Sequence, residues 1–346
     1  MVKLKHFNIP IFVPHEGCPH DCVFCNQKSI TGVKESFDIG RVKKTIDDHL
    51  ESIHKTYDEC RVEVAFFGGS FTGIEVSKQE AYLNLTKAYL DAGLIDGVRL
   101  STRPDYIDKT VLDRLDYYGV TTIELGVQSL VEDVLESANR GHDIACVDKA
   151  CALIKKRKFK LGLQMMIGLP GDTLEKSLVT MEKIISLKPD MVRIYPTIVI
   201  ENTDLAVLYK KGFYKPLTLD QAVNWCAVLY KHFTHYGIPV IRMGLQASES
   251  LSESLAGPYH PSFRQLVESK LYYDVLDGVL KPGRVSVYVH PKEISFLVGQ
   301  KRDNLNRLEK KYGIKKISVY PKDMDSNEFE VHMNGQVFKV PKMTVK

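Results

Sequence analysis

Six short apolar runs, separated by stretches with helical spacing, occupy the first 200 residues of this 346-residue chain. The apolar runs are Phe7–Val13, Val62–Phe67, Val98–Ser101, Thr121–Val127, Lys160–Ile167 and Met191–Ile200. The amphipathic stretches are Ile39–Thr56, Ser77–Ala92, Asp143–Lys156 and Thr173–Ser186. Parallel neighbouring strands need a crossover connection, so this alternation predicts parallel βαβ units. We expect an α/β fold built on a partial (β/α)6 barrel, with its site in the loops after the strands.

The pattern changes after residue 200. Helical spacing over Asp204–Lys211, Thr218–Thr234 and Pro258–Asp277, with a short strand at Ile238–Met243, predicts an extension of the barrel. The sequence Lys281-Pro-Gly283 is typical of a turn, and we expect the last domain to begin there. We therefore predict a barrel over residues 1–200, its extension over 201–280 and a small α+β domain over 281–346.

Composition limits the class of protein. The chain is 44% hydrophobic and 26% charged, as in ordinary globular proteins. No stretch approaches the roughly 20 apolar residues of a membrane span, and Met1–His6 is too polar to begin a signal peptide. Seven cysteines are too few, and odd in number, for a disulfide framework. We expect a cytoplasmic protein with no membrane partner.

Positive charge is concentrated in the last domain. Residues 281–346 contain 14 Lys and Arg against 7 Asp and Glu, whereas the rest of the chain contains 33 against 36. This asymmetry is typical of an appended module that binds a polyanion such as RNA. A solvated, lysine-rich surface is the alternative explanation.

Three cysteines on one short loop are the candidate metal ligands. Cys18, Cys22 and Cys25 lie in HEGCPHDCVFCNQ with the spacing C-x3-C-x2-C. Thiolates suit iron–sulfur clusters or zinc, and three of them leave one iron of a cubane cluster open to an outside ligand. A structural zinc loop is the alternative, with His15 or His20 as the fourth ligand.

The cysteine spacing resembles that of the radical S-adenosylmethionine (SAM) superfamily. The resemblance implies a 4Fe-4S cluster held by the three cysteines, with the amino and carboxylate groups of SAM on the open iron. It also implies reductive cleavage of SAM to a 5′-deoxyadenosyl radical, and an electron donor such as flavodoxin or ferredoxin. Phe24, between the second and third cysteines, is then expected beside the cluster and the adenine.

Polar motifs follow the predicted strands and supply candidate SAM contacts. Gly68, Gly69 and Ser70 end the second strand, and paired glycines let a ligand approach the backbone closely. In the superfamily such a pair meets the amino group of SAM. Arg103 or Arg140 can bind the SAM carboxylate with a bidentate fork.

Glu124 and Gln128 end the fourth strand, where a core strand would bury them at a cost of several kcal/mol unless each were paired. Gln128 is a candidate for the ribose hydroxyls, with Gln164 sharing that task. A structural bridge between Arg103 and Glu124 is the alternative.

The fifth and sixth strands add further candidates. Met166 and Ile167 are expected to form an apolar edge beside the adenine, with Gly168 allowing close approach. Tyr195 is expected to point toward substrate, although a core tyrosine fits the pattern nearly as well. Tyr195 and Glu124 are the catalytic candidates.

Several strings between residues 8 and 245 resemble the radical SAM half of the Elongator catalytic subunit and its bacterial relatives. They are CPHDCVFCNQ, FFGGSFTGI, STRPDYID, ELGVQSL, NRGH, GLPGDT and RIYPTIVIENTDL. In that subunit the domain helps to install a carboxymethyl-type group on a wobble uridine, using acetyl-CoA. The cysteine spacing is shorter here and no acetyltransferase domain follows. We therefore expect radical generation, without the complete carboxymethylation reaction.

The segment from Val285 to Tyr320 has the order strand, helix, tight loop, helix, strand. It resembles a KH module, most closely those of the bacterial transcription-elongation factor NusA, whose G-x-x-G loop clamps an RNA backbone. Gly299, Gln300, Lys301 and Arg302 occupy that loop, with Arg302 in place of the second glycine. Glu328–Val331 and Gln336–Val340 around Asn334-Gly335 then predict a β-hairpin. Protein docking or stabilisation is the alternative role.

These features favour a radical SAM enzyme that modifies a base in tRNA or rRNA. Two alternatives stay open from the sequence. One is chemistry on a tetrapyrrole or another small molecule, since the Gly-Val-Gln and Gly-Leu-Pro motifs also resemble oxygen-independent coproporphyrinogen dehydrogenases. The other is a non-catalytic RNA- or ribosome-binding protein that carries a cluster.

Overall fold

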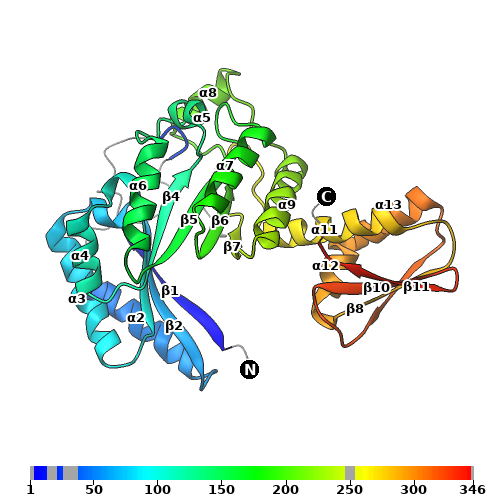
Figure 1. The fold of residues 1–346 in the computed structure, drawn as a ribbon, viewed down its shortest axis with the longest axis horizontal. Coiled ribbons are helices and arrows are strands. Elements are labelled where there is room, and N and C mark those ends of the chain that lie inside the picture. Colours follow the sequence, from blue (N-terminus) through cyan, green and yellow to red (C-terminus); the bar gives the residue numbers. More distant parts are fainter. Residues whose placement is uncertain (1–3, 14–21, 26–37, 246–253, 344–346) are drawn as a thin grey trace.

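The computed structural model describes residues 4–13, 22–25, 38–245 and 254–343. Its larger body is a curved, seven-stranded sheet in which the strands follow one another in chain order and every neighbouring pair is parallel (Figure 1). The strands are β1 (Lys5–Val13), β2 (Cys60–Gly68), β3 (Gly97–Thr102), β4 (Thr122–Gln128), β5 (Lys160–Ile167), β6 (Met191–Pro196) and β7 (Val240–Met243). The predicted α/β fold and partial barrel are confirmed.

The sheet has one more strand than the six predicted for the barrel. The short strand expected in the extension is β7, and it pairs with β6 at the edge of the sheet. β6 itself ends at Pro196, four residues earlier than predicted. The reason is that Val199 leaves the sheet and exchanges backbone hydrogen bonds with Leu255 and Ala256.

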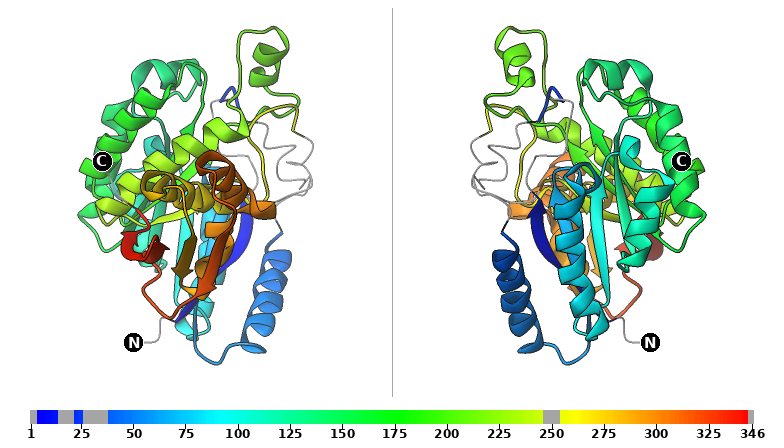
Figure 2. Two further views of the ribbon diagram at one scale, coloured as in Figure 1. Left: turned by 90° about the vertical axis from the view of Figure 1, so that its right-hand side faces the viewer. Right: turned by 90° about the vertical axis from the view of Figure 1, so that its left-hand side faces the viewer.

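Helices cover the outer face of the curved sheet (Figures 1 and 2). They are α2 (Ile39–His54), α3 (Val76–Asp91), α4 (Lys109–Tyr117), α6 (Ile144–Lys155), α7 (Leu174–Ser186) and α9 (Leu219–His235). Helices α5 (Glu132–Ser137) and α8 (Asp204–Lys210) lie at the carboxyl ends of the strands, and α11 (Phe263–Val279) leads into the smaller body. Asp and Thr side chains cap several of them, for example Asp38, Asp143 and Thr218. Helix α11 begins five residues later than predicted, after Pro261. None of the helices among the described residues combines the length and hydropathy of a membrane span.

Strand side chains alternate between an apolar outer face and a polar inner face. Outward residues such as Val64, Leu100 and Ile123 are fully buried in one core beneath the helices. Inward residues include Glu124 and Arg193, whose side chains meet inside the curve of the sheet. Because the strands are parallel, their carboxyl ends share one rim, and the loops that carry the polar motifs gather there.

The last part of the chain forms a smaller body with its own sheet and core (Figure 1). Its elements are β8 (Val285–Val289), α12 (Ile294–Val298), α13 (Asp303–Tyr312), β9 (Ile317–Pro321), β10 (Glu328–Met333) and β11 (Gln336–Pro341). The sheet order is β11-β10-β8-β9; β8 and β9 are parallel, and β10 is antiparallel to β8 and β11. The order of elements is the one predicted, and the β10–β11 hairpin is present. The KH-like identity stays a prediction.

One helix belongs to both bodies. Phe263, Val267 and Leu271 of α11 lie in the core of the larger body, whereas Tyr272 and Leu276 lie in the core of the smaller one. The second core thus begins within α11, before the boundary expected at residue 281. The reason is that α11 is one continuous helix whose first half packs in one core and whose second half packs in the other. No turn residue in the sequence marks the point where the second core begins.

A buried lysine fixes the end of β11 against this shared helix. Lys342, which is 7% exposed, donates a 2.6 Å hydrogen bond to Glu293, and its Nζ lies 2.7 Å from Glu268 Oε2 of α11. Burial alone would lower the pKa of Lys342, but the two carboxylates outweigh it and raise that pKa above its ordinary value. The chain therefore returns to α11 through a charged, buried contact.

Replacing Lys342 with Met should destabilise the protein, because the partly buried Glu293 loses its cation and the buried Glu268 keeps only the more distant Arg264, at 3.5 Å. We expect a loss of about 3–5 kcal/mol, seen as a fall of about 5–10 °C in the midpoint of thermal unfolding. Lys339→Met, whose side chain is 69% exposed, is the matched control and should change little. Equal midpoints for the two variants would contradict a structural role for Lys342.

Candidate functional site

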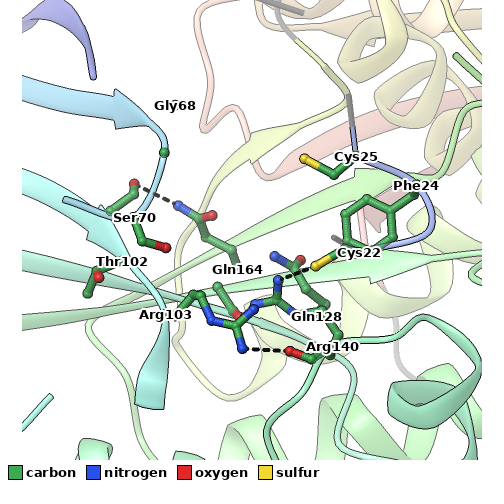
Figure 3. Close-up of a pocket in the computed structure, with 13 residues that line it drawn as sticks. Cys22, Phe24, Cys25, Gly68, Ser70, Thr102, Arg103, Gln128, Arg140 and Gln164 are labelled. Atoms are coloured by element: carbon green, nitrogen blue, oxygen red, sulfur yellow. Dashed lines mark hydrogen bonds between the residues drawn. The ribbon is translucent and has the colours of Figure 1, made fainter. Parts of the chain in front are cut away.

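A polar cavity lies at the carboxyl ends of the barrel strands (Figure 3). Side chains and backbone from the cysteine segment, β2, β3, β4, β5 and the loop after α5 meet around it. Its lining residues are Cys22, Phe24, Cys25, Gly68, Gly69, Ser70, Ser101, Thr102, Arg103, Gly126, Gln128, Arg140 and Gln164. Ten of these belong to the predicted set of cluster and SAM residues. The structure thus brings together motifs that are up to 140 residues apart in the chain.

The segment that carries Cys22 and Cys25 is held from two sides. The N–H of Val23 donates to Ala138 at the end of α5, and its carbonyl accepts from Leu205 at the start of α8. Phe24 packs with Val23 against small apolar clusters on both sides. Cys18, and with it His15 and His20 of the zinc alternative, lies outside the described residues. No group of three or more His, Cys, Asp or Glu side chains that could hold a metal occurs among the residues described.

Arg140 joins the cysteine segment to the barrel. Its Nη1 donates to the sulfur of Cys22 at 3.2 Å, and its Nη2 donates to the carbonyl of Gly126 at 2.6 Å. Space is limited at Gly126, because a Cβ at that position would lie 3.0 Å from Gln128 Nε2 and 3.5 Å from Arg140 Nη2. Figure 3 shows Arg140 between Cys22 and Arg103, so this arginine connects the two parts of the cavity wall.

Two backbone features shape the wall. Gly68 has φ +105°, and a Cβ there would lie 2.9 Å from the carbonyl of Val13, so the turn after β2 needs glycine. Gln128 has φ +68° at an irregularity of the β4 ladder, which is an unfavourable backbone conformation for a residue with a side chain. Its Oε1 is buried and accepts no hydrogen bond from the described residues. Strain and an unpaired acceptor at one residue indicate a ligand contact.

Arg103 is tied to a neighbour. Its Nε and Nη2 donate to Asp105 at 2.9 and 3.0 Å, and Nη2 also donates to the carbonyl of Arg140 at 2.6 Å. The bridge to Glu124 that we considered as the alternative is not formed. Arg103 is therefore placed at the cavity but already holds a carboxylate of its own chain.

Glu124 lies below the cavity, in a buried ion network inside the barrel. Its carboxylate contacts Arg193 at 2.5 and 2.8 Å and Arg99 at 3.0 Å, and Arg99 in turn pairs with Glu63 at 2.6 Å. Burial alone would raise the pKa of Glu124, but the charges of Arg193 and Arg99 outweigh it and lower that pKa. A carboxylate held in this way is a poor proton carrier. Glu124 does not line the cavity, and its assignments as catalytic candidate and as SAM contact stay predictions.

Other predicted residues lie away from the cavity wall. The side chain of Ile167 is fully buried in the main core, because it points to the opposite face of β5 from Gln164 and Met166. It cannot form the predicted apolar edge beside an adenine. Met166 packs with Phe24 and Leu169 at the back of the cysteine segment.

Gly168 serves the turn after β5. With φ +75°, it leaves room for Leu217, which a Cβ would approach to 2.9 Å. Its N–H donates to Asp172, and its carbonyl accepts from the Tyr214 hydroxyl. The predicted close approach of a ligand there stays a prediction. Tyr195 does not line the cavity; burial raises its pKa, so it is a neutral phenol beside Arg193.

The loop predicted to hold RNA connects α12 and α13 of the smaller body. Gly299, Lys301 and Arg302 all have positive φ, between +50° and +77°. The guanidinium of Arg302 forms two hydrogen bonds with Glu309, at 2.7 and 2.9 Å. Lys301 is exposed, and so it is the residue of this loop best placed to meet a phosphate.

Three lining residues were absent from the prediction. Ser101 accepts a hydrogen bond from Gln164, and Thr102 shares one with Thr72 of the turn after β2. Gly126 is the third. All three stand in the quoted motifs STRPD and ELGVQ, so motif membership was the available signal. Their small, neutral side chains gave no chemical reason to choose them.

Comparisons with known proteins agree with this geometry. The model of the Radical SAM superfamily matches residues 12–184, which is half of the chain, and that of the Radical_SAM C-terminal domain matches residues 189–273. A protein of Methanocaldococcus jannaschii named tRNA uridine(34) acetyltransferase is 28% identical over 261 residues, covering 62% of this chain and 47% of that protein. Elongator complex protein 3 of Homo sapiens is 29% identical over 257 residues, covering 62% and 47%.

A solved structure shares the fold. The archaeal Elp3 of Methanocaldococcus infernus, solved without its N-terminal residues, has a TM-score of 0.62 with 18% identity, covering 95% of this chain and 74% of that one. The chain spans about half the length of the curated relatives it matches. The predicted resemblance to the Elongator catalytic subunit and its relatives is confirmed for this part of those proteins.

Glu124→Gln tests the structural role of the buried ion network. It keeps the size of the side chain but removes the anion between Arg99 and Arg193, so we expect a loss of about 3 kcal/mol in the free energy of unfolding. Glu136→Gln, an exposed carboxylate on α5, is the control. Chemical denaturation of the cluster-free protein measures both. A Glu124→Gln variant as stable as its control would contradict a structural role for the ion network.

His142, in the NRGH motif, should make the fold sensitive to acid. Burial first, and then the charges of Arg140 and Arg103, lower its pKa to about 4. The unfolded chain takes up a proton near pH 6.5 and the folded chain does not, so stability is lost as pH falls from about 6.5 to about 4.

We expect His142→Gln to remove on the order of 2–3 kcal/mol of this pH dependence. Denaturant unfolding at a series of pH values measures it, with the exposed His54→Gln as control. The same acid sensitivity in all three proteins would contradict the prediction.

Proposed function

This chain belongs to the radical SAM superfamily, and from that premise we propose that it modifies a base in tRNA or rRNA by radical chemistry. The superfamily uses a 4Fe-4S cluster and SAM, and their reductive reaction supplies the 5′-deoxyadenosyl radical. In this proposal Cys18, Cys22 and Cys25 hold the cluster and the cavity beside them holds SAM. An electron donor such as a flavodoxin or ferredoxin supplies the electron.

One observation carries the proposal. Two thiols, an arginine that donates to one of them, and a glutamine with an unpaired buried acceptor line the same cavity. Soft sulfur ligands beside a polar pocket fit a cluster next to a charged, hydroxyl-bearing cofactor. The zinc alternative gives no reason for the strained Gln128 or for the glycine turn after β2.

The residues of the chain have distinct tasks in this site. Arg140 holds the Cys22 sulfur by an N–H···S hydrogen bond, a contact of the kind that tunes the potential of iron–sulfur clusters. In this proposal Gln128 Oε1 accepts from a ribose hydroxyl, and the backbone at Gly68 and Gly69 meets the amino group of SAM. Arg103, fixed by Asp105, holds the carbonyl of Arg140 and so positions that residue.

RNA is the proposed substrate because two independent features support it. The relative from M. jannaschii is named for a tRNA uridine. The smaller body carries the excess of positive charge, and its Gly299–Arg302 loop presents an exposed lysine. The target nucleotide and the group transferred are left open, because this chain covers only half of those relatives.

Cysteine variants test the cluster assignment. After anaerobic reconstitution the protein should hold about four irons per chain. Changing Cys18, Cys22 and Cys25 to Ala together should abolish iron binding, whereas Cys146→Ser, a partly exposed cysteine of α6, should leave it unchanged. Iron analysis and the visible absorption spectrum measure this. Unchanged metal content in the triple variant would defeat the assignment.

RNA from cells that lack this protein tests the substrate. Mass spectrometry of digested tRNA and rRNA should reveal one modified nucleoside that disappears, and it should return with the wild-type gene but not with the triple cysteine variant. If every modified nucleoside is retained in the absence of the protein, RNA is not the substrate.

A further inference from the structure

A second cavity, of about 320 Å³, lies between the two bodies of the protein. Helices α9 and α11 form one wall, and the loop and first turn of α13, from Gly299 to Arg307, form the other. Its volume is within the range of small-ligand pockets. It shares no residue with the cavity at the barrel rim.

Polar groups without partners line this second cavity. Ser269 of α11 is 5% exposed, and its hydroxyl has no hydrogen-bond partner among the described residues. A buried polar group left in this state costs about 1–3 kcal/mol, so it indicates a missing ligand group. The side-chain amides of Asn224 on α9, which is exposed, and Gln300, which is partly exposed, form no hydrogen bond within the described parts of the chain, so both are accessible to a ligand.

The wall is held in place before any ligand arrives. Asn304 Nδ2 donates to the carbonyl of Ser269 at 2.8 Å and to that of Leu297 at 3.1 Å, which ties the loop to α11. Gly299, with φ +77°, allows this approach, since a Cβ would lie 3.0 Å from Asn304 Cγ. A pre-formed wall lowers the entropic cost of binding.

The charged side chains in and around the second cavity limit which chemical groups can bind there. Asp220 and Asp303 line the cavity together with Lys270 and Arg307, and Arg307 pairs with Asp303 at 3.4 Å, so the charges of the wall balance one another. Lys301 is exposed next to Gln300, and Arg307 lies over the ring of Tyr273 at 4.3 Å. An uncharged group inside and an anionic backbone outside suit this arrangement.

We propose that the second cavity binds one unstacked nucleobase of a single-stranded RNA segment whose phosphates pass Lys301. The RNA partner is taken from the proposed function. Amide side chains such as Asn224 and Gln300 recognise the edges of bases, and Leu219 and Val223 offer an apolar surface to the base plane. The Ser269 hydroxyl gains its missing partner from the base or its ribose.

The test compares two kinds of variant with a single-stranded RNA oligonucleotide, using fluorescence anisotropy over a series of salt concentrations. Asn224→Ala/Gln300→Ala should weaken binding by about tenfold without changing the salt dependence. Lys301→Ala should instead reduce the slope of log K against log salt by about one. Thermal unfolding of each variant checks that the fold is retained, as expected for side chains that form no hydrogen bond among the described residues.

Oligonucleotides that lack one base at a time provide the positional readout. Loss of one particular base should weaken binding to the wild type and have no further effect in the Asn224→Ala/Gln300→Ala variant. Equal binding of all oligonucleotides by both proteins would overturn the cavity assignment while leaving RNA binding intact.

Free nucleosides separate failure of the cavity from failure of the RNA proposal. A mixture of adenosine, guanosine, cytidine and uridine should shift the amide NMR signals of Ser269 and Lys270 in the wild type, and the Asn224→Ala/Gln300→Ala variant should lose that shift. A shift without any RNA binding would support the base site and defeat the RNA substrate. Absence of the shift would overturn the base site whatever RNA does.

Discussion

The pairing of buried charges inside the barrel is the constraint on which the site depends. Glu124 sits between Arg99 and Arg193, and Arg99 reaches on to Glu63, so each charge that the inner face of the sheet buries has a partner. An unpaired charge there would cost several kcal/mol. The network also orients Gln164, which donates to both Glu124 and Ser101 and so connects this layer to the cavity above it. The polar side chains below the cavity are therefore held in position by interactions within the protein itself.

The sequence was sufficient for the layout of the larger body and for most of the residues at its rim. Apolar runs predicted all seven strands, six as the barrel and the seventh as part of its extension, and parallel strands necessarily bring their terminal motifs to one edge. The ion-pair partners of the buried charged residues could not be predicted from the sequence. Arg103 pairs with Asp105, two residues away, whereas Glu124 pairs with Arg193, 69 residues away, and nothing in local spacing distinguishes these outcomes. The side of β5 on which Ile167 lies depends on strand register, which a continuous apolar run does not reveal.

Arg140 shows how one loop residue can unite separate parts of a site. Its guanidinium contacts the Cys22 sulfur and the carbonyl of Gly126, while its own carbonyl accepts from Arg103. The cysteine segment, β4 and the end of β3 therefore share a single polar junction. The sequence pointed to this residue for its charge, but the structure gives it a scaffolding task as well. We expect a displacement of the cysteine segment to alter the contacts of Arg140 with β4 and with the end of β3.

The continuous helix α11 has a consequence for how the protein can be divided. Its first half completes the core of the barrel body, and its second half supplies Tyr272 and Leu276 to the other core. A truncation after residue 280 would leave an apolar strip on an otherwise complete barrel, and an isolated fragment from residue 281 would lack part of its interior. A gene fusion that moved the positively charged smaller body to another enzyme would therefore have to include α11, because both cores depend on this helix.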